Sequence, residues 1–415
     1  MGLRILMISD VYFPRINGVS TSIQTFRSAF AESGHEPLLI APAYPVPTVA
    51  PAEADIVRVA SRYVPRDPED RMMRGGAFEA AAAQYRRGDF DIVHIQTPFV
   101  AHYRGIALAR RLGVPVVETY HTYFEEYLHH YVPLLPRRLM RFLARRFTVS
   151  QCRSLDALVV PSRAMQAALA EYGVTTEMAV IPTGLDMRRF AGGDGARFRA
   201  ALGISAERPV LVHVGRIAHE KNVDFLLRML VRLRPRIPEV QMVIAGEGPA
   251  LAHCRALADS LGLAENVRFV GYLDRGSTLL DCYRAGDLFV FASRTETQGL
   301  VLLESMALGT PVVATAHMGT CDILEPQRGS VIAPDDEQGF ADTVGNLLLD
   351  GDRRRALATD APAYAATWSA GAMAARLVEL YQEVCERHRE RAIHPSAGLA
   401  AGGPGGTDPA DPALR

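Results

Sequence analysis

The sequence contains little cysteine, no long hydrophobic run and no excess of charge, and each absence excludes a class of protein. Its five cysteines are scattered without a Cys-x-x-Cys pair, which argues against a disulfide framework or a zinc site. No apolar segment approaches the roughly 20 residues that span a bilayer. The first ten residues also lack the apolar core of a signal peptide. We therefore expect a protein of the cytoplasm with reduced thiols.

The net charge of −1 gives the chain no general attraction for nucleic acid. What the sequence does contain is an alternation of short apolar runs and helical segments, typical of parallel βαβ units. The expected strands of the first half are 3–9, 36–42, 56–59, 91–96, 114–120, 157–162 and 178–183. Those of the second half are 209–216, 240–248, 267–273, 288–293, 310–315 and 330–334. The fold class is thus α/β, with two doubly wound, Rossmann-like parallel sheets facing a central cleft.

The boundary between the two domains is expected in the Gly-rich, polar stretch 184–207, which reads as a linker. We assign residues 1–188 to the first domain and 189–369 to the second. A helix at about 370–392 closes the structure, and the Gly-, Pro- and Ala-rich tail 393–415 is expected to be disordered. The Pro-rich segment 43–70 is predicted to be mostly loop, apart from the strand at 56–59.

Two glutamates stand out in the segment 294–314, RTETQGLVLLESMALGTPVVA. Gly299 opens an apolar helix that contains Glu304, and a buried charge needs a polar partner. Glu296 lies just before this helix. The amides of Gly299, Leu300 and Val301 would favour phosphate oxygens. The structural alternative is that Glu296 only complements the helix dipole and Glu304 only belongs to a buried ion pair.

Two cations follow the predicted strand 209–216. Arg216 and Lys221 flank a turn that leads into a helix. At the carboxyl end of a strand they suit a pyrophosphate, since Arg makes a bidentate contact and Lys supplies a point charge. The alternative is a basic pair on the surface.

The first half offers Gly18 and His121 as candidate site residues. Gly18 stands in a sharp turn into a helix, where the backbone can approach a ligand closely. The turn lacks the Gly-x-Gly-x-x-Gly spacing of a dinucleotide site, which argues against a dehydrogenase. His121 ends a predicted strand, where it could orient a hydroxyl of a ligand, transfer a proton or serve a structural role. Asp89 and Asp91 enter a strand and are interpreted as a turn, so no metal site is expected.

Together these segments resemble the family 4 glycosyltransferases, retaining enzymes of the GT-B fold. The resemblance covers nearly the whole chain, through NGV, HTYF, IPTGLD, GRIAHEKN, IAGEGP and the two glutamates eight residues apart. It implies a metal-independent hexosyltransferase without a cofactor, whose substrate is a nucleotide sugar such as UDP-glucose or GDP-mannose. The first domain would hold the acceptor and the second the donor, and the closing helix would return to the first domain.

The resemblance also implies roles for the candidate residues. Arg216 and Lys221 would hold the donor diphosphate, and Glu304 the ribose hydroxyls. Catalytic roles would fall to Glu296, at the hydroxyls of the transferred sugar, and to His121, near the reacting centre. The remaining donor contacts would come from Gly18, Gly299, Leu300 and Val301. Many relatives have a glutamate after the strand at 310–315, whereas this chain has AHMGTCDIL; Gly319 and Thr320 are expected to replace its contacts.

A run of arginines and apolar residues between residues 127 and 155 predicts a basic, amphipathic helix beside the acceptor site. Its membrane-side candidates are Arg137, Arg138, Arg141 and Arg145. Such a helix can lie on an anionic membrane; the alternative is a core helix with a solvated arginine face. The HTYFEEYLHHY and ETQGLVLLE segments resemble those of diacylglycerol glucosyltransferases, so we expect a lipid acceptor such as diacylglycerol at the inner face of the plasma membrane.

Two other readings remain open. The acceptor could be a soluble sugar or polysaccharide, as for a GDP-mannose-dependent mannosyltransferase. The chain could instead bind a sugar nucleotide without catalysis, although the retained Arg216, Lys221, Glu296 and Glu304 argue against this. The sequence leaves the oligomeric state open.

Overall fold

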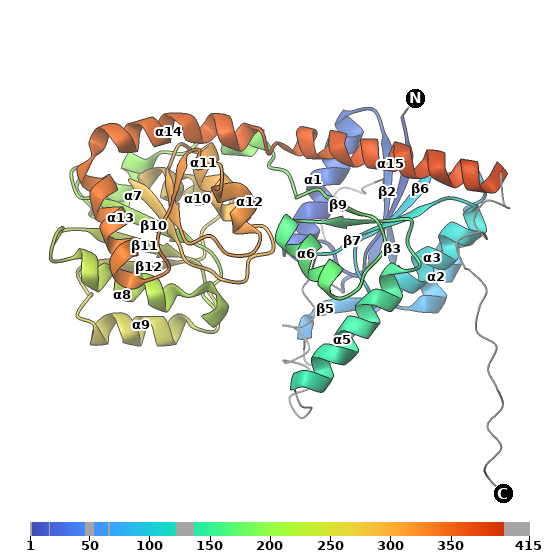
Figure 1. Ribbon diagram of the computed structural model, residues 1–415, viewed down its shortest axis with the longest axis horizontal. Coiled ribbons are helices and arrows are strands. Elements are labelled where there is room, and N and C mark those ends of the chain that lie inside the picture. The colour runs from blue at the N-terminus through green and yellow to red at the C-terminus, as the bar shows by residue number, and fades with distance from the viewer. Residues whose placement is uncertain (1, 16, 46–53, 65–66, 122–136, 394–415) are drawn as a thin grey trace, which may run out of the picture.

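Two parallel sheets, each covered by helices, make up the protein (Figure 1). The computed structural model describes residues 2–15, 17–45, 54–64, 67–121 and 137–393, without the side chains of 67–70 and 137–141. The tail predicted from 393 onward therefore lies outside the described residues, except for Ile393, which ends a helix. No helix in the described part combines the length and apolar content that crossing a bilayer requires.

The first sheet has seven strands, all paired in parallel. In spatial order they are β3 (Ile56–Val59), β2 (Glu36–Pro42), β1 (Arg4–Ile8), β6 (Ile92–Ile95), β7 (Val116–Thr119), β8 (Ala157–Val160) and β9 (Met178–Val180). The accompanying helices are α1 (Gly18–Glu32), α2 (Gly75–Ala82), α3 (Val100–Leu112), α5 (Arg137–Cys152) and α6 (Arg163–Glu171). The central strands are buried on both faces, which explains their continuous apolar sequences.

The second sheet has six strands, also paired in parallel. Their order is β12 (Val267–Gly271), β11 (Gln241–Ala245), β10 (Val210–Val214), β13 (Leu288–Phe291), β14 (Val312–Ala314) and β15 (Ser330–Ile332). Its helices are α7 (Gly195–Ala201), α8 (Val223–Leu233), α9 (Leu251–Ser260), α10 (Thr278–Ala285), α11 (Leu300–Ala307), α12 (Thr320–Leu324), α13 (Glu337–Leu349) and α14 (Gly351–Ala366). The predicted fold class, with two Rossmann-like parallel sheets, is confirmed.

The last helix, α15 (Ala370–Ile393), returns to the first sheet (Figure 1). Met373, Leu377 and Tyr381 pack in the same buried cluster as Phe26 and Phe30 of α1. The chain therefore passes between the sheets twice, once after β9 and once before α15. The two crossings lie together, because the Leu185 amide donates to the Trp368 carbonyl at 2.8 Å and the Ala370 amide to the Leu185 carbonyl at 2.8 Å.

Two local expectations are wrong. The segment 43–70, interpreted mostly as loop, contains part of a hairpin of β4 (Ser61–Val64) and β5 (Asp67–Met73). The stretch 184–207, interpreted as a linker, contains a 3-10 turn (Met187–Phe190) and helix α7. Asp194 caps α7 by accepting from the Arg197 amide at 3.0 Å. Phe198 is buried in the core of the second sheet, so this stretch is part of the packed fold.

Candidate functional site

Lys221 and Glu296 meet at the carboxyl edge of the second sheet. Lys221 ends a short 3-10 turn after β10, and Glu296 follows β13, the neighbouring strand. The Lys221 Nζ atom lies 2.5 Å from Glu296 Oε1, and their side chains are 23% and 18% exposed. Asn222 takes a left-handed conformation there (φ 57°), and its side-chain amide donates to the Ala292 carbonyl, which fixes the turn. The structure thus brings together one predicted cation and one predicted carboxylate.

Arg216 lies on the same edge, directly after β10, but does not join this pair. Its guanidinium is 66% exposed and stands 4.0 Å from the Glu220 carboxylate. A long side chain with such exposure can move to a ligand at little cost, because its contact with Glu220 is a weak surface ion pair.

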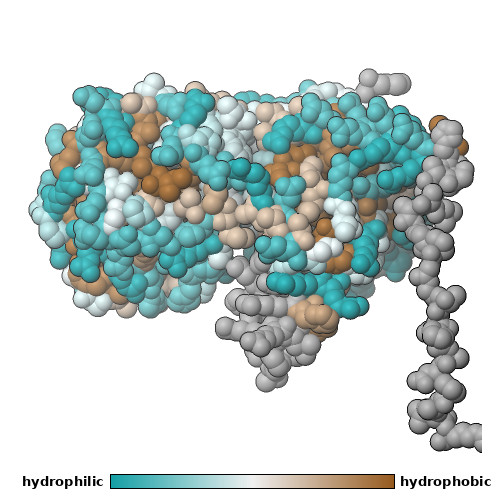
Figure 2. Space-filling model, viewed as in Figure 1, coloured by the Kyte–Doolittle hydropathy of each residue, from teal (hydrophilic) through white to brown (hydrophobic). Residues whose placement is uncertain are grey.

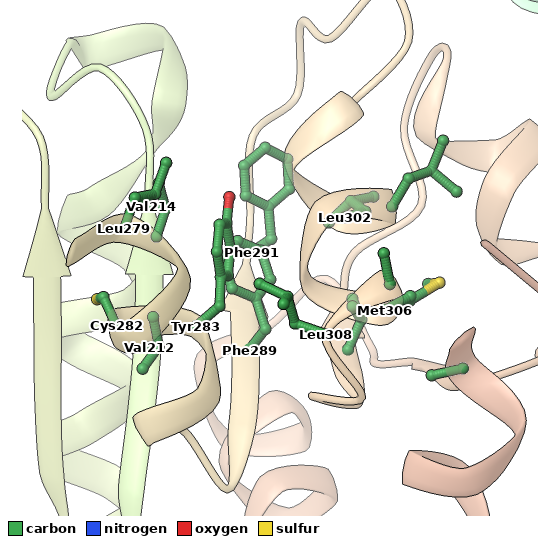
Figure 3. Packing of buried hydrophobic residues seen from close by; sticks show 14 of the residues in the cluster. Val212, Val214, Leu279, Cys282, Tyr283, Phe289, Phe291, Leu302, Met306 and Leu308 are labelled. Carbon is green, nitrogen blue, oxygen red and sulfur yellow. The ribbon is translucent and has the colours of Figure 1, made fainter. Parts of the chain in front are cut away.

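Glu304 lies inside α11 and is 7% exposed. The Tyr283 hydroxyl of α10 donates to Glu304 Oε2 at 2.8 Å, and Arg275 stands 3.7 Å from Oε1. Burial raises the pKa of Tyr283 well above its usual value, and the Glu304 carboxylate raises it further, so the phenol stays a donor. Figure 3 shows Tyr283 in the packed cluster between α10 and α11. Glu304 therefore has the polar partners that its buried position requires.

Two glycines shape the loop before α11: Gly299 lies within it, and Gly319 packs against its main chain. Gly299 has φ +96°, which L-residues rarely adopt, and it precedes the helix whose first amides have no partner within the helix. Gly319 donates its amide to the Glu296 carbonyl at 2.8 Å. A Cβ at Gly319 would lie 2.0 Å from the Thr297 carbonyl oxygen. The segment 317–320 therefore packs against the main chain of Glu296 and Thr297 and holds it in place.

This support conflicts with the expectation that Gly319 and Thr320 take over ligand contacts of a missing glutamate. The Gly319 amide is already used by Glu296. The Thr320 hydroxyl donates to the His317 carbonyl and accepts from the His317 amide. Thr320 is also fully buried. The polar groups of Gly319 and Thr320 are thus used for contacts within the protein, and the expectation that they contact the donor is wrong for these atoms.

In the first domain, Gly18 begins α1. Asn17 caps this helix by accepting from the Ser20 amide at 2.8 Å. A Cβ placed on Gly18 would meet nothing within 4 Å, so the space beside it is open to a ligand.

His121 follows β7 and contacts Gln96, which follows β6. Its Nε2 atom lies 3.0 Å from the Gln96 amide oxygen, an obligate acceptor, so Nε2 carries the proton and Nδ1 is left as an acceptor. Burial lowers the pKa of His121 to about 4 and that of the neighbouring His94 to about 3. His121 is therefore a neutral imidazole at physiological pH. The rest of the HTYF segment lies outside the described residues.

Sequence reasoning missed two groups of buried polar side chains in the first domain. Asp10, after β1, is 3% exposed and its Oδ2 accepts from the Ala101 amide at 2.9 Å and the Thr97 hydroxyl at 3.1 Å. Burial raises the pKa of Asp10 to about 6. His102 and Glu118 form a second buried group, in which His102 Nδ1 lies 2.5 Å from Glu118 Oε2. The positions of Asp10 and Glu118 at strand ends were the available signal.

Helix α5 occupies the predicted basic segment, and its described half is packed in an unexpected way. The residues that face the core are Ala144, Thr148, Gln151 and Cys152. Phe142, Leu143 and Phe147 are instead 55%, 49% and 40% exposed. Figure 2 shows a hydrophobic patch over α5 bordered by hydrophilic atoms. Residues 142–152 thus combine a buried face on the core and exposed arginines with exposed apolar side chains. The side chains of Arg137, Arg138 and Arg141 lie outside the description.

The Asp-x-Asp sequence at 89–91 is a structural turn. Asp91 binds Arg4 at 2.9 Å, and Asp89 accepts from the Arg86 amide at 2.8 Å. Across the described residues, no group of three or more His, Cys, Asp or Glu side chains is placed to hold a metal ion.

Comparison with known proteins identifies the family. A model described as Glycosyltransferase Family 4 matches residues 16–189, and one described as Glycosyl transferases group 1 matches residues 194–363. The chain is 32% identical over 326 residues to an alpha-monoglucosyldiacylglycerol synthase of Streptococcus pneumoniae, covering 75% of this chain and 71% of the relative. The chain belongs to the family 4 glycosyltransferases.

Two further comparisons define what this family 4 glycosyltransferase is similar to. A GDP-mannose-dependent alpha-mannosyltransferase of Mycobacterium tuberculosis is 28% identical, with 85% of this chain and 90% of that protein covered. The crystal structure of Anabaena HepE in complex with UDP and glucose superposes with a TM-score of 0.71 at 18% identity, covering 92% of this chain and 100% of that one. This structural likeness confirms the GT-B fold.

Proposed function

We propose that this glycosyltransferase transfers a hexose, with retention, from a nucleotide diphosphate sugar to the hydroxyl of a membrane lipid such as diacylglycerol. The observation that carries the donor half is the meeting of Lys221 and Glu296 beside the start of α11. The observation that carries the acceptor half is the exposed apolar side of α5.

In the donor half, Lys221 and Arg216 would bind the diphosphate. Both cations follow β10, and the amides of Gly299, Leu300 and Val301 at the start of α11 add positive dipole ends. Fixed positive charge at the leaving diphosphate stabilises the transition state, because that group gains charge as the glycosidic bond breaks. Glu304, held by Tyr283 at 2.8 Å, would accept from the ribose hydroxyls.

Glu296 and His121 would contact the transferred sugar from opposite domains. A histidine whose pKa is about 4 is a weak base, so His121 is suited to accept a hydrogen bond at Nδ1 rather than to take a proton. Glu296 would accept from sugar hydroxyls after Lys221 turns to the diphosphate. The departing phosphate oxygen would then receive the proton of the acceptor hydroxyl on the same face of the sugar, which retains the anomeric configuration.

In the acceptor half, we propose that the first domain docks on an anionic bilayer through an aromatic–arginine surface, consisting of Phe99, Tyr103, Phe142, Leu143, Phe147, Arg145 and Arg146. Of nine large hydrophobic residues exposed in the described part, six lie between residues 63 and 147. The Gln151 side chain donates to the Pro98 carbonyl at 2.7 Å, which joins α5 to the start of α3. Aromatic residues beside arginines suit the headgroup region of an anionic membrane. The enzyme would then act as a peripheral protein of the inner face of the plasma membrane.

The names of the relatives support this choice of substrates. The 32% identical relative is named for glucosylation of diacylglycerol, and the superposed structure contains UDP and glucose. UDP-glucose is therefore the first donor to test. The mannosyltransferase relative makes GDP-mannose the second donor.

The experiment measures nucleotide release and product mass with either donor, using vesicles that contain diacylglycerol with and without anionic lipid. We expect a glycolipid product, and faster transfer on anionic vesicles. A Phe142→Ser, Phe147→Ser variant should bind vesicles at least about tenfold more weakly. Leu349→Ser, which changes an even more exposed apolar residue of the second domain, should bind like the parent protein. If the double variant bound vesicles as tightly as the parent protein, the proposed docking through the aromatic–arginine surface would be wrong. Transfer to a soluble sugar without vesicle binding would instead support the soluble-acceptor alternative.

A further inference from the structure

Gln298 joins the two domains at the proposed donor site. It lies between Glu296 and Gly299 and is 6% exposed. Its side-chain nitrogen donates to the Thr183 carbonyl at 2.7 Å, and its side-chain oxygen accepts from the Thr183 amide at 2.9 Å. A primary amide is suited to this reciprocal pairing, since it presents a donor and an acceptor side by side.

The contact continues into the first domain. The Thr183 hydroxyl donates to the Ser22 hydroxyl at 2.8 Å, and both residues are buried. Ser22 belongs to α1, the helix that begins at Gly18. A connected path of hydrogen bonds therefore runs from the segment 296–299 to the start of α1.

Thr183 is itself held firmly. Next to it, Gly184 packs so closely that a Cβ there would lie 2.5 Å from the Ala370 Cα atom. Leu185 is bonded to both residues flanking Ser369, at the place where the chain crosses between domains. Gln298 is thus attached to a rigid point of the first domain rather than to a loop.

We propose that Gln298 is a positioning residue, which sets the placement of the donor segment 296–299 relative to α1 and the acceptor side. This inference rests on the proposed donor site. Its physical basis is that Glu296 and Gly299 lie within two residues of Gln298, so a loss of the reciprocal bonds displaces them with respect to Gly18 and His121. A displacement of about 1 Å at reacting groups lowers a rate by roughly 10²-fold.

The test compares Gln298→Leu and Gln298→Glu with two controls. Leucine removes both bonds, and glutamate removes the donor while it keeps the shape. Thr183→Val and Ser22→Ala break the hydroxyl link to α1 but leave the Gln298 bonds to the main chain of residue 183, so we expect them to lower kcat less than the Gln298 variants do. We expect both Gln298 variants to lower kcat about tenfold to hundredfold, while UDP or GDP, used as the probe, binds within about threefold of the parent affinity. A purely structural residue would lower stability and nucleotide affinity together.

A second measurement needs no turnover. Hydrogen exchange is followed in segments 18–24 and 296–300 as nucleotide is added. In the parent protein we expect protection in both segments, and in Gln298→Leu protection of 296–300 alone. If the variant still protects 18–24, or keeps the parent kcat, the positioning role is wrong. If the parent protein binds neither nucleotide, the proposed donor site is wrong.

Discussion

Replacing Glu296 by glutamine should have opposite effects on nucleotide binding and on transfer. In the free protein the Lys221 ammonium is 2.5 Å from the Glu296 carboxylate. UDP carries the diphosphate without the sugar, so it needs Lys221 and gains nothing from Glu296. The carboxylate therefore competes with UDP for Lys221, and Glu296→Gln removes the competitor.

The structure sets the size of this effect. At the 2.5 Å separation of this pair and an effective dielectric constant of about 20, the Coulomb attraction is about 7 kcal/mol. Desolvation offsets most of that attraction, and a hydrogen bond to a charged group contributes about 1.5–3 kcal/mol net. The pair is less than one-quarter exposed, so screening is partial. Allowing for the new contact that glutamine makes with Lys221, we expect UDP to bind about threefold to tenfold more tightly, which corresponds to about 0.6–1.4 kcal/mol.

Calorimetric titration with UDP, together with transfer kinetics, measures both effects. Transfer by Glu296→Gln should fall at least about tenfold, because the charged contacts to the sugar are lost. Lys221→Met should weaken UDP binding, and Glu296→Gln should have no further effect on UDP in that background. The competition would be refuted if Glu296→Gln bound UDP more weakly than the parent protein. It would also be refuted if Glu296→Gln raised the UDP affinity equally in the Lys221→Met background.

Two other predictions concern stability. Gly319→Ala should lower the free energy of unfolding by about 1–3 kcal/mol and reduce transfer, since its Cβ would collide with the Thr297 carbonyl; Gly18→Ala, in open space, should stay within about 0.5 kcal/mol. His213 is fully buried and burial lowers its pKa to about 4 from 6.5, so its contribution is present above pH 6.5 and is lost as the pH falls toward 4. Between pH 7 and 5 the free energy of unfolding should fall by about 2 kcal/mol because of this group. Urea unfolding of His213→Phe, whose ring can stack on Phe289 and Phe291 as the imidazole does, should therefore depend less on pH than that of the parent protein. An equal pH dependence of the unfolding free energy in the two proteins would contradict the assignment.

The sheets were predictable because their strands are buried on both faces and read as short apolar runs. The hairpin of β4 and β5 gave no such pattern, since Pro65 and Pro68 interrupt it and charged residues are frequent. Helix α7 was missed because the sequence GGDG was interpreted as a linker. In fact its Asp194 is an N-cap, a signal that was present in the sequence.

In the candidate site, too, some features could be predicted from the sequence and others could not. Lys221 and Glu296 could each be placed at the cleft from the sequence, because both follow predicted parallel strands, whose carboxyl ends share one edge of the sheet. Their ion pair was not predicted. Gln298 could not be found in this way, since its partner is the main chain of Thr183, 115 residues away. For α5, apolar residues and arginines surround the helix, so periodicity did not decide which face packs. Ala144 and Thr148 decide it, by facing the core.

The central claim is that the second domain holds a nucleotide diphosphate sugar with Glu304 at its ribose. The most direct measurement is turnover of UDP-glucose and GDP-mannose by Glu304→Ala combined with Tyr283→Phe, which avoids leaving the Tyr283 hydroxyl unpaired. Tyr283→Phe alone is the matched control, and urea unfolding monitors the fold. We expect a folded double variant whose turnover is at least about 10²-fold lower than that of the control. Turnover equal to the control with either donor would contradict the claim.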